Sequence, residues 1–435
     1  MCNARGSIVS IFSLYINDFE GELLSSVCEP TYLRELALFL LMYADDTVLM
    51  AESKEGLQDI LDKLHTYCAK WDIEVNVAKT KIVVFRNGMK LPRSYSWSYN
   101  METIEIVNSF NYLGLTLNFN GNFALTQKIL AQQGTKCMFG ILKTCKDNCL
   151  NIQSMLRVFD TYVACVLSYG AEIWGFHVGR DIEKVHTRFC KMILKVKNST
   201  SNFMTYTELC RVPLVIHRKV RILKYWVKIL STHNCILKQL YDEMYDNPHH
   251  NSWISDVKDL FCSLAFSNVW YLQKVYNPCH LFAMVKQRLT DIFIQERNAF
   301  FEKSSKCYIY RYLTDSFDLQ YYLRKNIPEH LIHYLSKYRL SAHKLAIEQG
   351  RYRQTERSSR VCKFCNFNKV EDEYHFILEC PQYGNLRDLY IKKFYYLRPS
   401  TFKLIQLLSI RNRKQLNYLC VFLKKATNHR NTVLA

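Results

Sequence analysis

The clearest pattern of apolar and polar positions in the chain is helical and lies between residues 53 and 71. Apolar side chains recur there every three or four positions and therefore fall on one helix face: Leu57, Ile60, Leu61, Leu64, Tyr67, Cys68 and Trp71. Ser53 stands where it can cap the first turn. Short apolar runs at residues 36–43 and 81–85 flank this helix and predict strands. We therefore predict a mixed α+β unit over residues 1–120.

The pattern changes after residue 120. Residues 123–341 are poor in Gly and Pro, and their apolar faces are interrupted by many Lys and Arg, which favours packed helices. From residue 343 onward, a basic stretch leads into a compact Cys/His cluster and then into apolar helical segments. The pattern predicts three parts: an α+β unit at 1–120, a mainly α-helical region at 121–341, and a small metal-binding module at 342–435.

Composition narrows the class of protein. The chain has 435 residues, of which 49% are hydrophobic and only 13 are Gly and 8 are Pro. At roughly 100 to 200 residues per domain this allows two to four units with ordinary cores, and it excludes a largely disordered chain. Lys and Arg exceed Asp and Glu by 58 to 39, a net charge of +19. This balance favours a polyanionic partner such as nucleic acid, although basic proteins without a specific partner also exist.

Two further features concern the compartment. The N-terminus lacks a secretory pattern, and the longest apolar run, residues 36–44, is far shorter than the roughly 20 residues of a membrane span. We therefore expect no membrane association and an intracellular location, in the nucleus, the cytoplasm or both. The 17 Cys are odd in number and mostly scattered, so we expect buried thiols or metal ligands and no disulfide framework.

The first candidate site is an acidic pair. Tyr43-Ala44-Asp45-Asp46 separates two apolar runs, residues 36–42 and 47–51, which predicts a hairpin with adjacent carboxylates at its tip. Two like charges so close raise each other's pKa unless a cation neutralises them. Magnesium prefers carboxylate oxygens and retains open positions for phosphate, so it is the expected cation.

Such a pair suits two-metal phosphoryl transfer, in which carboxylates hold two ions about 3.5 to 4 Å apart. Asp45 is then the principal ligand, and Asp46 is the second. The small Ala44 side chain leaves room for a primer end, and Tyr43 can pack beside a sugar or base. Taken alone, the same four residues also fit a solvated turn that binds no metal.

Residues 43–50 resemble the palm motif of reverse transcriptases. Three further blocks of sequence stand around this motif in the order that the family has, and they favour the catalytic interpretation over the solvated turn. Before the motif, residues 12–19 (Phe-Ser-Leu-Tyr-Ile-Asn-Asp-Phe) resemble the end of the template-contacting palm helix of LINE-type enzymes. After the motif, Asn76-Val77-Ala78-Lys79-Thr80-Lys81 resembles the next palm motif, and Phe110-Asn111-Tyr112-Leu113-Gly114 resembles the primer-grip hairpin. The chain is thus similar to the C-terminal part of a reverse transcriptase from a non-LTR retrotransposon, with weaker similarity at 168–174 and 209–214.

The resemblance implies roles for individual residues. It implies an α+β palm remnant followed by a helical thumb and connection region, with Asp45, Asp46 and Lys79 catalytic and Lys79 near the departing pyrophosphate. It also implies nucleic-acid contacts by Tyr43, Ala44, Tyr112, Leu113 and Gly114. The implied cofactor is Mg²⁺, and the implied partners are an RNA template, a DNA primer and another protein encoded by the element.

The sequence also departs from the family. The family's first palm strand carries another metal-binding aspartate upstream of the template helix, and no residue here matches it. The earlier carboxylates either belong to a different motif or fall in an expected loop: Asp18, Glu20, Glu22, Glu29 and Glu35. Ile8-Val9-Ser10-Ile11 stands where a Ser-Pro step is expected, and neither fingers nor an endonuclease domain is recognisable. We therefore expect that this chain is a truncated polymerase that does not polymerise DNA alone.

The second candidate site is the Cys/His cluster. Cys362, Cys365, His375 and Cys380 have the spacing C-x2-C-x9-H-x4-C. Three thiolates and one imidazole at these distances match a closed tetrahedral Zn²⁺ site, which has no open position for catalysis. The alternative is coincidence in a Cys-rich chain. Residues 362–387 also resemble the C-terminal cysteine-rich motif of LINE-type elements.

Basic residues just before and within this cluster suggest a phosphate-binding surface: Arg351, Arg353, Arg357, Arg360 and Lys363.

Three hypotheses follow for the whole chain. The first is part of an RNA-directed DNA polymerase, whose missing half comes from a longer product or another chain. The second is a non-catalytic nucleic-acid-binding remnant, and the third is a domesticated scaffold that uses only the zinc module.

Overall fold

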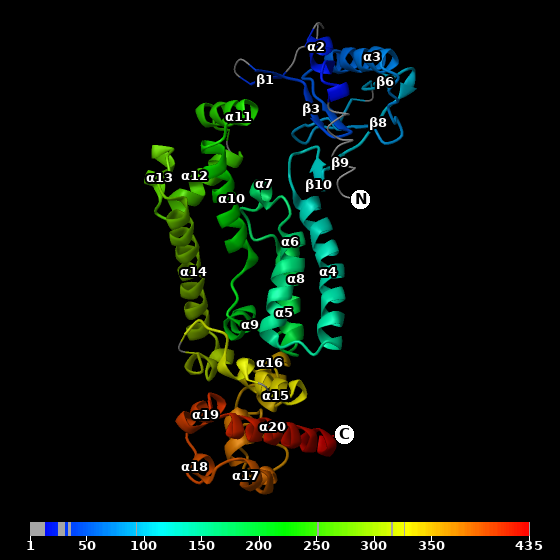
Figure 1. The fold of residues 1–435 in the computed structure, drawn as a ribbon. Helices are drawn as coiled ribbons and strands as arrows, with labels where there is room; N and C mark the ends of the chain where they lie inside the picture. The colour runs from blue at the N-terminus through cyan, green and yellow to red at the C-terminus, as the bar shows by residue number, and fades with distance from the viewer. Residues whose placement is uncertain are drawn as a thin grey trace. The chain divides into compact units, whose positions relative to one another are not determined.

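The computed structural model describes residues 14–24, 31–33, 36–92, 94–249, 252–314, 316–325 and 327–434 (Figure 1). The chain divides into two compact units. The first comprises Met1–Ile129, Glu172–Trp174 and Ile222–Pro278, and the second comprises Leu130–Ala171, Gly175–Arg221 and Cys279–Ala435. Among the residues described, helices predominate after residue 120, as the sequence predicted.

The N-terminal part of the first unit combines α2 (Phe19–Leu24) and α3 (Lys54–Lys70) with short paired strands. Four of the pairings are antiparallel, and β5 pairs with β8 in parallel. The strands are β1 (Thr31–Leu33), β2 (Leu36–Leu38), β3 (Leu40–Tyr43), β4 (Asp46–Leu49), β5 (Lys81–Ile82), β6 (Ser98–Tyr99), β7 (Glu102–Thr103), β8 (Glu105–Ile106), β9 (Ser109–Tyr112) and β10 (Leu115–Asn118). The predicted mixture of helix and strand is therefore present.

Helix α3 organises this α+β part. The Ser53 side chain accepts a hydrogen bond from the Gly56 amide at 3.0 Å, so the predicted N-cap is confirmed. One side of the helix packs into a cluster with Phe19, Phe39 and Tyr67, and Leu61 packs into a second cluster with Trp97. Because α3 contributes to both clusters, it fixes the strands that carry the acidic pair.

The remainder of the first unit is helical. It contains the end of α10 (Leu214–Leu230) with α11 (Cys235–Asp246), α12 (Trp253–Ser263) and α13 (Ser267–Leu272). Trp226 is fully buried and packs on Phe261 and Trp270, with ring centroids 4.9 and 6.1 Å away. Its indole N–H donates to the Tyr241 hydroxyl at 2.9 Å, which satisfies the buried polar group.

The second unit is built almost entirely from helices. Its first half contains most of α4 (Ala124–Asp147), α5 (Ile152–Val158), the π-helical turn η1 (Phe159–Val163), α6 (Ala164–Leu167), α8 (Arg180–Ile193) and α9 (Asn202–Leu209). Helix α4 approaches α6 closely at Gly134. A Cβ atom at Gly134 would lie 2.3 Å from Cδ2 of the fully buried Leu167, so any other residue there would force the Leu167 side chain to move.

The second half of this unit carries the Cys/His cluster. Its elements are α14 (Pro278–Lys303), η2 (Ser305–Cys307), η3 (Tyr310–Tyr312), η4 (Tyr321–Arg324), α15 (Glu329–Arg339), α16 (Ala346–Tyr352), η5 (His375–Glu379), η6 (Pro381–Tyr383), α17 (Gly384–Tyr390), α18 (Lys393–Tyr396), α19 (Thr401–Leu408) and α20 (Arg413–Leu434). Helix α20 packs against α15 and α17. The cluster therefore folds together with the last helix of the chain.

A buried ion pair joins three of these elements. Arg339, at the end of α15, donates through Nε to Glu208 of α9 at 2.7 Å and through Nη1 to the Leu408 carbonyl of α19 at 2.8 Å. The Tyr310 hydroxyl donates to the other Glu208 oxygen at 2.7 Å. Because each charged group has hydrogen-bond partners, this fully buried pair avoids the desolvation cost of an isolated charge.

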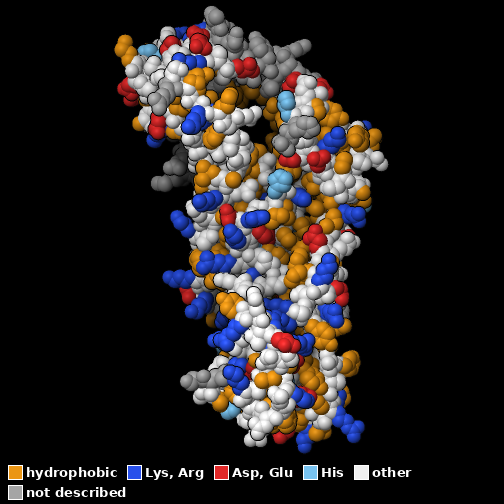
Figure 2. Space-filling view, turned by 180° about the vertical axis from the view of Figure 1, so that it is seen from behind, with side chains coloured by type: hydrophobic (Ala, Val, Ile, Leu, Met, Phe, Trp, Pro, Cys, Tyr) orange, Lys and Arg blue, Asp and Glu red, His pale blue; other side chains and the backbone are white. Residues whose placement is uncertain are grey.

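The surface of the second unit is rich in cations. Figure 2 shows lysine and arginine side chains along its helices on the face opposite to the view of Figure 1. Lys136, Lys143 and Lys146 of α4 and Arg188 of α8 are all exposed. No helix among the described residues is both long enough and apolar enough to cross a membrane.

Candidate catalytic hairpin and metal centre

The acidic pair lies at the tip of a tight hairpin. Strands β3 and β4 pair from Leu40 opposite Leu49 to Tyr43 opposite Asp46, so Ala44 and Asp45 form a two-residue turn. Both aspartates are exposed, and the Tyr43 side chain is 64% exposed. The predicted hairpin with two accessible carboxylates at its tip is therefore present.

The turn has an unusual backbone. Ala44 has a φ of 56°, a left-handed conformation that favours glycine and costs energy for other residues. Strained backbone persists only where the surrounding structure imposes it, here the β3–β4 pairing on both sides. Its effect is to place Asp45 and Asp46 consecutively at the tip, with only a methyl group beside them.

A second hairpin lies close to the first. Strands β9 and β10 pair from Ser109 opposite Asn118 to Tyr112 opposite Leu115. Leu113 and Gly114 form the turn with φ values of 48° and 81°, as a type I′ turn requires. Partial burial and the nearby Asp46 carboxylate raise the pKa of Tyr112. The structure thus brings the predicted primer-grip residues and the acidic pair into one neighbourhood.

Lys79 lies on an exposed turn. Its amide donates to both the carbonyl and the side-chain oxygen of Asn76, each at 3.1 Å. The side chain is exposed, and within the described part of the chain it forms no contact with Asp45 or Asp46. Its catalytic role therefore stays a prediction.

The residues before the hairpin supply no further metal ligand where they are described. The Asp18 carboxylate accepts a hydrogen bond from Tyr67 at 2.5 Å, and Glu22 pairs with Lys70 at 2.6 Å. Among the described residues, no His, Cys, Asp or Glu joins Asp45 and Asp46 in a group of three that could hold an ion. Residues 8–13, which entered the comparison with the template helix, and the early carboxylates Glu29 and Glu35 lie outside the described residues.

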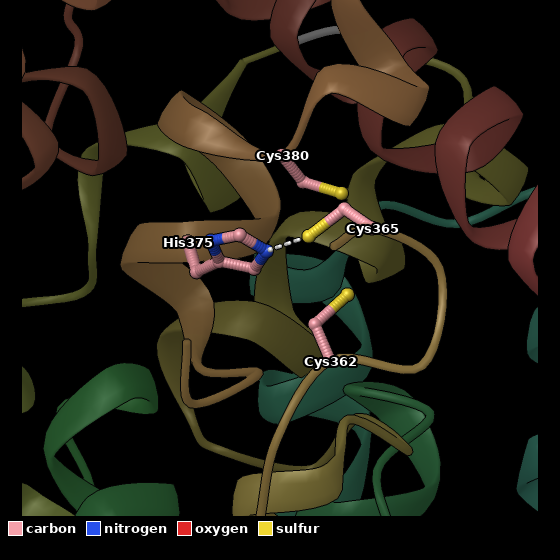
Figure 3. Close-up of side chains that lie close together, drawn as sticks. All are labelled: Cys362, Cys365, His375 and Cys380. Atoms are coloured by element: carbon pink, nitrogen blue, oxygen red, sulfur yellow. Dashed lines mark hydrogen bonds between the residues drawn. The ribbon is translucent and has the colours of Figure 1, made fainter. Parts of the chain in front are cut away.

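The Cys/His cluster is assembled as a tetrad (Figure 3). The ligand atoms of Cys362, Cys365, His375 and Cys380 all lie within 4.8 Å of one another. The Cys365 sulfur and His375 Nε2 are 3.3 Å apart. Cys365 is partly buried and the other three residues are buried. The structure therefore gathers every residue of the predicted zinc set, and no other described His, Cys, Asp or Glu belongs to the group.

Local structure explains how the four residues meet. Val361 pairs with Val370 in an antiparallel bridge, so the intervening loop carries the first two cysteines back toward the rest of the module. His375 begins the π-helical turn η5 and Cys380 ends it. Pro381 starts the next helical turn, a position where its missing amide N–H costs no helical hydrogen bond.

A shell of contacts orients the ligands. His375 Nδ1 lies 3.4 Å from Glu379, which also pairs with Lys369 at 2.8 Å, so Nε2 is left to face the sulfurs. The buried Arg387 donates to the Cys380 carbonyl at 2.5 Å. Such contacts fix the imidazole tautomer and ligand geometry in metal sites.

The electrostatics of the tetrad favour a cation. Burial raises the pKa of the Cys362 thiol and raises that of Cys380 to about 12. Three thiols this close cannot ionise together unless a positive ion compensates their charge. Zinc accepts three sulfurs and one nitrogen in tetrahedral geometry, so the donor set fits Zn²⁺ and leaves no open ligand position.

The five predicted phosphate contacts separate into two groups. Arg353, Arg357 and Lys363 are exposed. In contrast, Arg351 contacts Glu348 and donates to the Ser305 carbonyl at 2.9 Å. Arg360 donates to the carbonyls of Thr355 and Ile347 at 2.9 and 3.1 Å. The guanidinium groups of Arg351 and Arg360 thus already bind backbone carbonyls, and phosphate binding by the five residues stays a prediction.

Sequence reasoning missed the contacts that hold the module in place. Glu371 forms a two-point ion pair with Arg430 of α20, and Glu373 lies 2.7 Å from His343. All four residues are buried. The available signal was an acidic residue, Glu371, between the ligands Cys365 and Cys380. Its partner Arg430 is 59 residues away and belongs to no motif, so the pair could not be predicted.

Comparison with known proteins identifies relatives of the part of the chain that carries the acidic pair. Residues 7–117 match the reverse transcriptase (RNA-dependent DNA polymerase) family. A transposon-derived protein of Caenorhabditis elegans is 27% identical over 139 residues, which cover 32% of this chain and 49% of that protein. The RNA-directed DNA polymerase from mobile element jockey of Drosophila funebris is 22% identical over 251 residues, covering 54% of this chain and 26% of that protein. The chain thus spans half or less of each relative.

Proposed function

We propose that this chain, whose residues 7–117 belong to the reverse transcriptases and which is related to those of non-LTR retrotransposons, carries the magnesium-binding hairpin of an RNA-directed DNA polymerase. The observation that carries the proposal is the strained β3–β4 turn, which presents Asp45 and Asp46 to solvent beside the hairpin of Tyr112. The RNA template and DNA primer are the proposed partners.

Each residue has a role in this proposal. Asp45 and Asp46 would hold magnesium through their carboxylate oxygens, and that positive charge would supply activation of the attacking hydroxyl and stabilisation of the leaving oxygen. The Ala44 methyl group leaves space for the primer end beside them. Tyr112, Leu113 and Gly114 position the primer, and Tyr43 packs beside a sugar or base. Lys79 is assigned to the departing pyrophosphate on family resemblance alone.

We further propose that the chain does not complete this metal site by itself. Two-metal transfer needs more carboxylate than one adjacent pair supplies, and the described residues contribute no third ligand. The jockey polymerase is also much longer than the region matched here. A carboxylate supplied by additional sequence or by another chain would then be needed for DNA synthesis.

A second candidate function, binding nucleic acid without catalysis, is favoured by the contrast between the two sites. The sulfur and nitrogen donors of the zinc tetrad are complete, whereas the residues that the structure describes offer only two carboxylates at the hairpin. In this proposal Zn²⁺ fixes the fold of the module, and the exposed Arg353, Arg357 and Lys363 contact phosphate. The third hypothesis, a domesticated scaffold, has no specific observation in its favour.

Binding of manganese(II) in place of magnesium tests the hairpin assignment directly. Titration followed by electron paramagnetic resonance should show weak binding that Asp45→Asn reduces at least roughly tenfold, since even indirect ligand contacts contribute that much. Glu52→Gln is the matched control because Glu52 is also an exposed carboxylate just after the hairpin. Equal binding by wild type and Asp45→Asn would refute the assignment.

A further inference from the structure

A groove of about 260 Å³ in the second unit lies apart from both candidate sites. Three segments line it: the chain from Tyr312 to Arg324, Arg339 at the end of α15, and residues 408–411 at and after the end of α19. The first two segments belong to the predicted helical region, and the third belongs to the predicted zinc module. The lining of the groove is rich in tyrosine and arginine: Tyr312, Tyr321, Tyr322, Arg324, Arg339 and Arg411.

The floor of the groove is rigid. Arg339 is fixed by Glu208 and by the Leu408 carbonyl, and its Nη2 donates to the Gln320 side chain at 2.8 Å. The buried Tyr322 hydroxyl lies 3.0 Å from the Ser336 hydroxyl. The polar groups beneath the groove therefore serve the fold, and they hold the rim residues in a preformed arrangement.

The rim carries exposed aromatic rings next to cations. The side chains of Tyr312 and Tyr321 are 51% and 38% exposed, which is unusual for rings that lie on a structured wall. The Arg311 guanidinium lies 4.9 Å from the centroid of the Tyr312 ring, and the Lys325 ammonium lies 4.3 Å from that of Tyr321. Each ring thus offers a stacking face within reach of a positive charge.

The charge of the groove is positive. Arg324 and Arg411 are exposed, and neither forms an ion pair with any residue the structure describes. Asp318 is the acidic residue on the described lining. Exposed cations without an acidic partner fit an anionic ligand, and exposed tyrosines fit a ligand with flat rings.

We propose that this groove binds single-stranded nucleic acid, with bases stacked on Tyr312 and Tyr321 and phosphates held by Arg324 and Arg411. A tyrosine can stack only on a base whose face is open, and neighbouring base pairs cover those faces in a duplex. An acidic peptide would use the arginines and leave the rings without a role. The proposal is independent of catalysis at Asp45 and of the phosphate contacts proposed beside the zinc module.

The test uses the purified full chain with zinc and measures fluorescence anisotropy of labelled single-stranded oligomers of deoxythymidine and of uridine. Tyr312→Ala with Tyr321→Ala should weaken binding by roughly 30-fold or more, because base stacking on each aromatic residue is typically worth at least about 1 kcal/mol. Comparison of the two oligomers distinguishes DNA from RNA as the preferred strand. A hairpin duplex of the same length should lose little affinity in this variant.

Two controls separate stacking from loss of structure. Tyr312→Phe with Tyr321→Phe retains the rings and should bind as wild type does. Tyr276→Ala removes an even more exposed tyrosine that lies beside Lys274, outside the groove, and should also bind as wild type does. Failure of either control to bind would overturn the proposal, because the loss would then not depend on stacking in the groove.

The arginines are tested through salt dependence. Each phosphate contact to a single strand contributes about 0.7 to the slope of log affinity against log salt. Arg324→Gln with Arg411→Gln should therefore reduce the slope by about 1.4. An unchanged slope, full affinity of the double alanine variant, or equal competition by polyglutamate would overturn the proposal. None of these outcomes bears on the carboxylates of the hairpin, whose test is metal binding.

Discussion

Arg430, near the end of the chain, donates two hydrogen bonds of 2.6 and 2.7 Å to the carboxylate of Glu371 in the Cys/His module. Both side chains are buried. Glu371 also accepts the Ala346 amide at 2.7 Å, so the pair ties the loop between the cysteines to α16 and α20. The zinc tetrad is therefore held by its ligands and by the last helix together.

Loss of Arg430 should be strongly destabilising. Arg430→Leu leaves the Glu371 carboxylate buried without its counterion, which typically costs about 3–5 kcal/mol. The double variant Arg430→Leu with Glu371→Gln removes that charge and keeps an acceptor for the Ala346 amide, so much of the stability should return. Urea unfolding in the presence of zinc measures both variants. Equal stability of the single and double variants would contradict this account of the pair.

Removal of zinc should unfold the module. In small domains the free energy of structural zinc binding, about 10–16 kcal/mol, stabilises the folded state because the site forms only on folding. We expect about one zinc per purified chain, and both chelation and Cys365→Ser should lower the melting temperature and abolish zinc retention. Cys235→Ser is the control, because Cys235 is exposed and belongs to α11. Elemental analysis with differential scanning fluorimetry decides the question, and full zinc content in Cys365→Ser would exclude the predicted ligand set.

The contact between α4 and α6 allows a matched pair of glycine substitutions. Gly134→Ala places a methyl group against the buried Leu167 and should destabilise the chain by about 1–3 kcal/mol. Gly140→Ala lies in the same helix with no atom within 4 Å of the added carbon, so it should stabilise the chain by about 0.5–1 kcal/mol. Chemical denaturation measures both effects. Changes of the same sign would show that the two helices do not pack as described.

The proximity of the two hairpins predicts a coupled titration. The Asp46 carboxylate disfavours the negatively charged tyrosinate, so it helps to raise the pKa of Tyr112 above 10.0. Asp46→Asn should lower that pKa, and partial burial should still keep it above the ordinary value. NMR titration of labelled tyrosine at high pH measures the change. An unaltered Tyr112 pKa in Asp46→Asn would mean that the hairpins are not neighbours.

Local sequence patterns anticipated much of the fold. Helical spacing of apolar residues defined α3 and its Ser53 cap, and the apolar runs around Asp45 and Asp46 defined the hairpin. The cysteine spacing defined the tetrad, because a closed zinc site restricts ligand spacing. These features depend on residues close together in the sequence, so the sequence alone predicts them.

Contacts between residues far apart in the sequence could not be predicted from it. Arg351 and Arg360 looked like free cations, yet both bind backbone carbonyls that only the folded module brings to them. The Arg339–Glu208 pair joins positions 131 residues apart without any motif. The tyrosine groove likewise depends on three distant segments whose meeting the sequence does not encode locally.

The most direct test of the central claim is magnesium-dependent primer extension on an RNA template by the purified chain. The Asp45→Asn, Asp46→Asn variant runs beside it as the control. Our account predicts no template-directed product beyond that of the variant, because the described part of the chain supplies two of the required carboxylates and no third. Product that wild type makes and the variant does not would contradict the account, since the chain would then complete the metal site unaided.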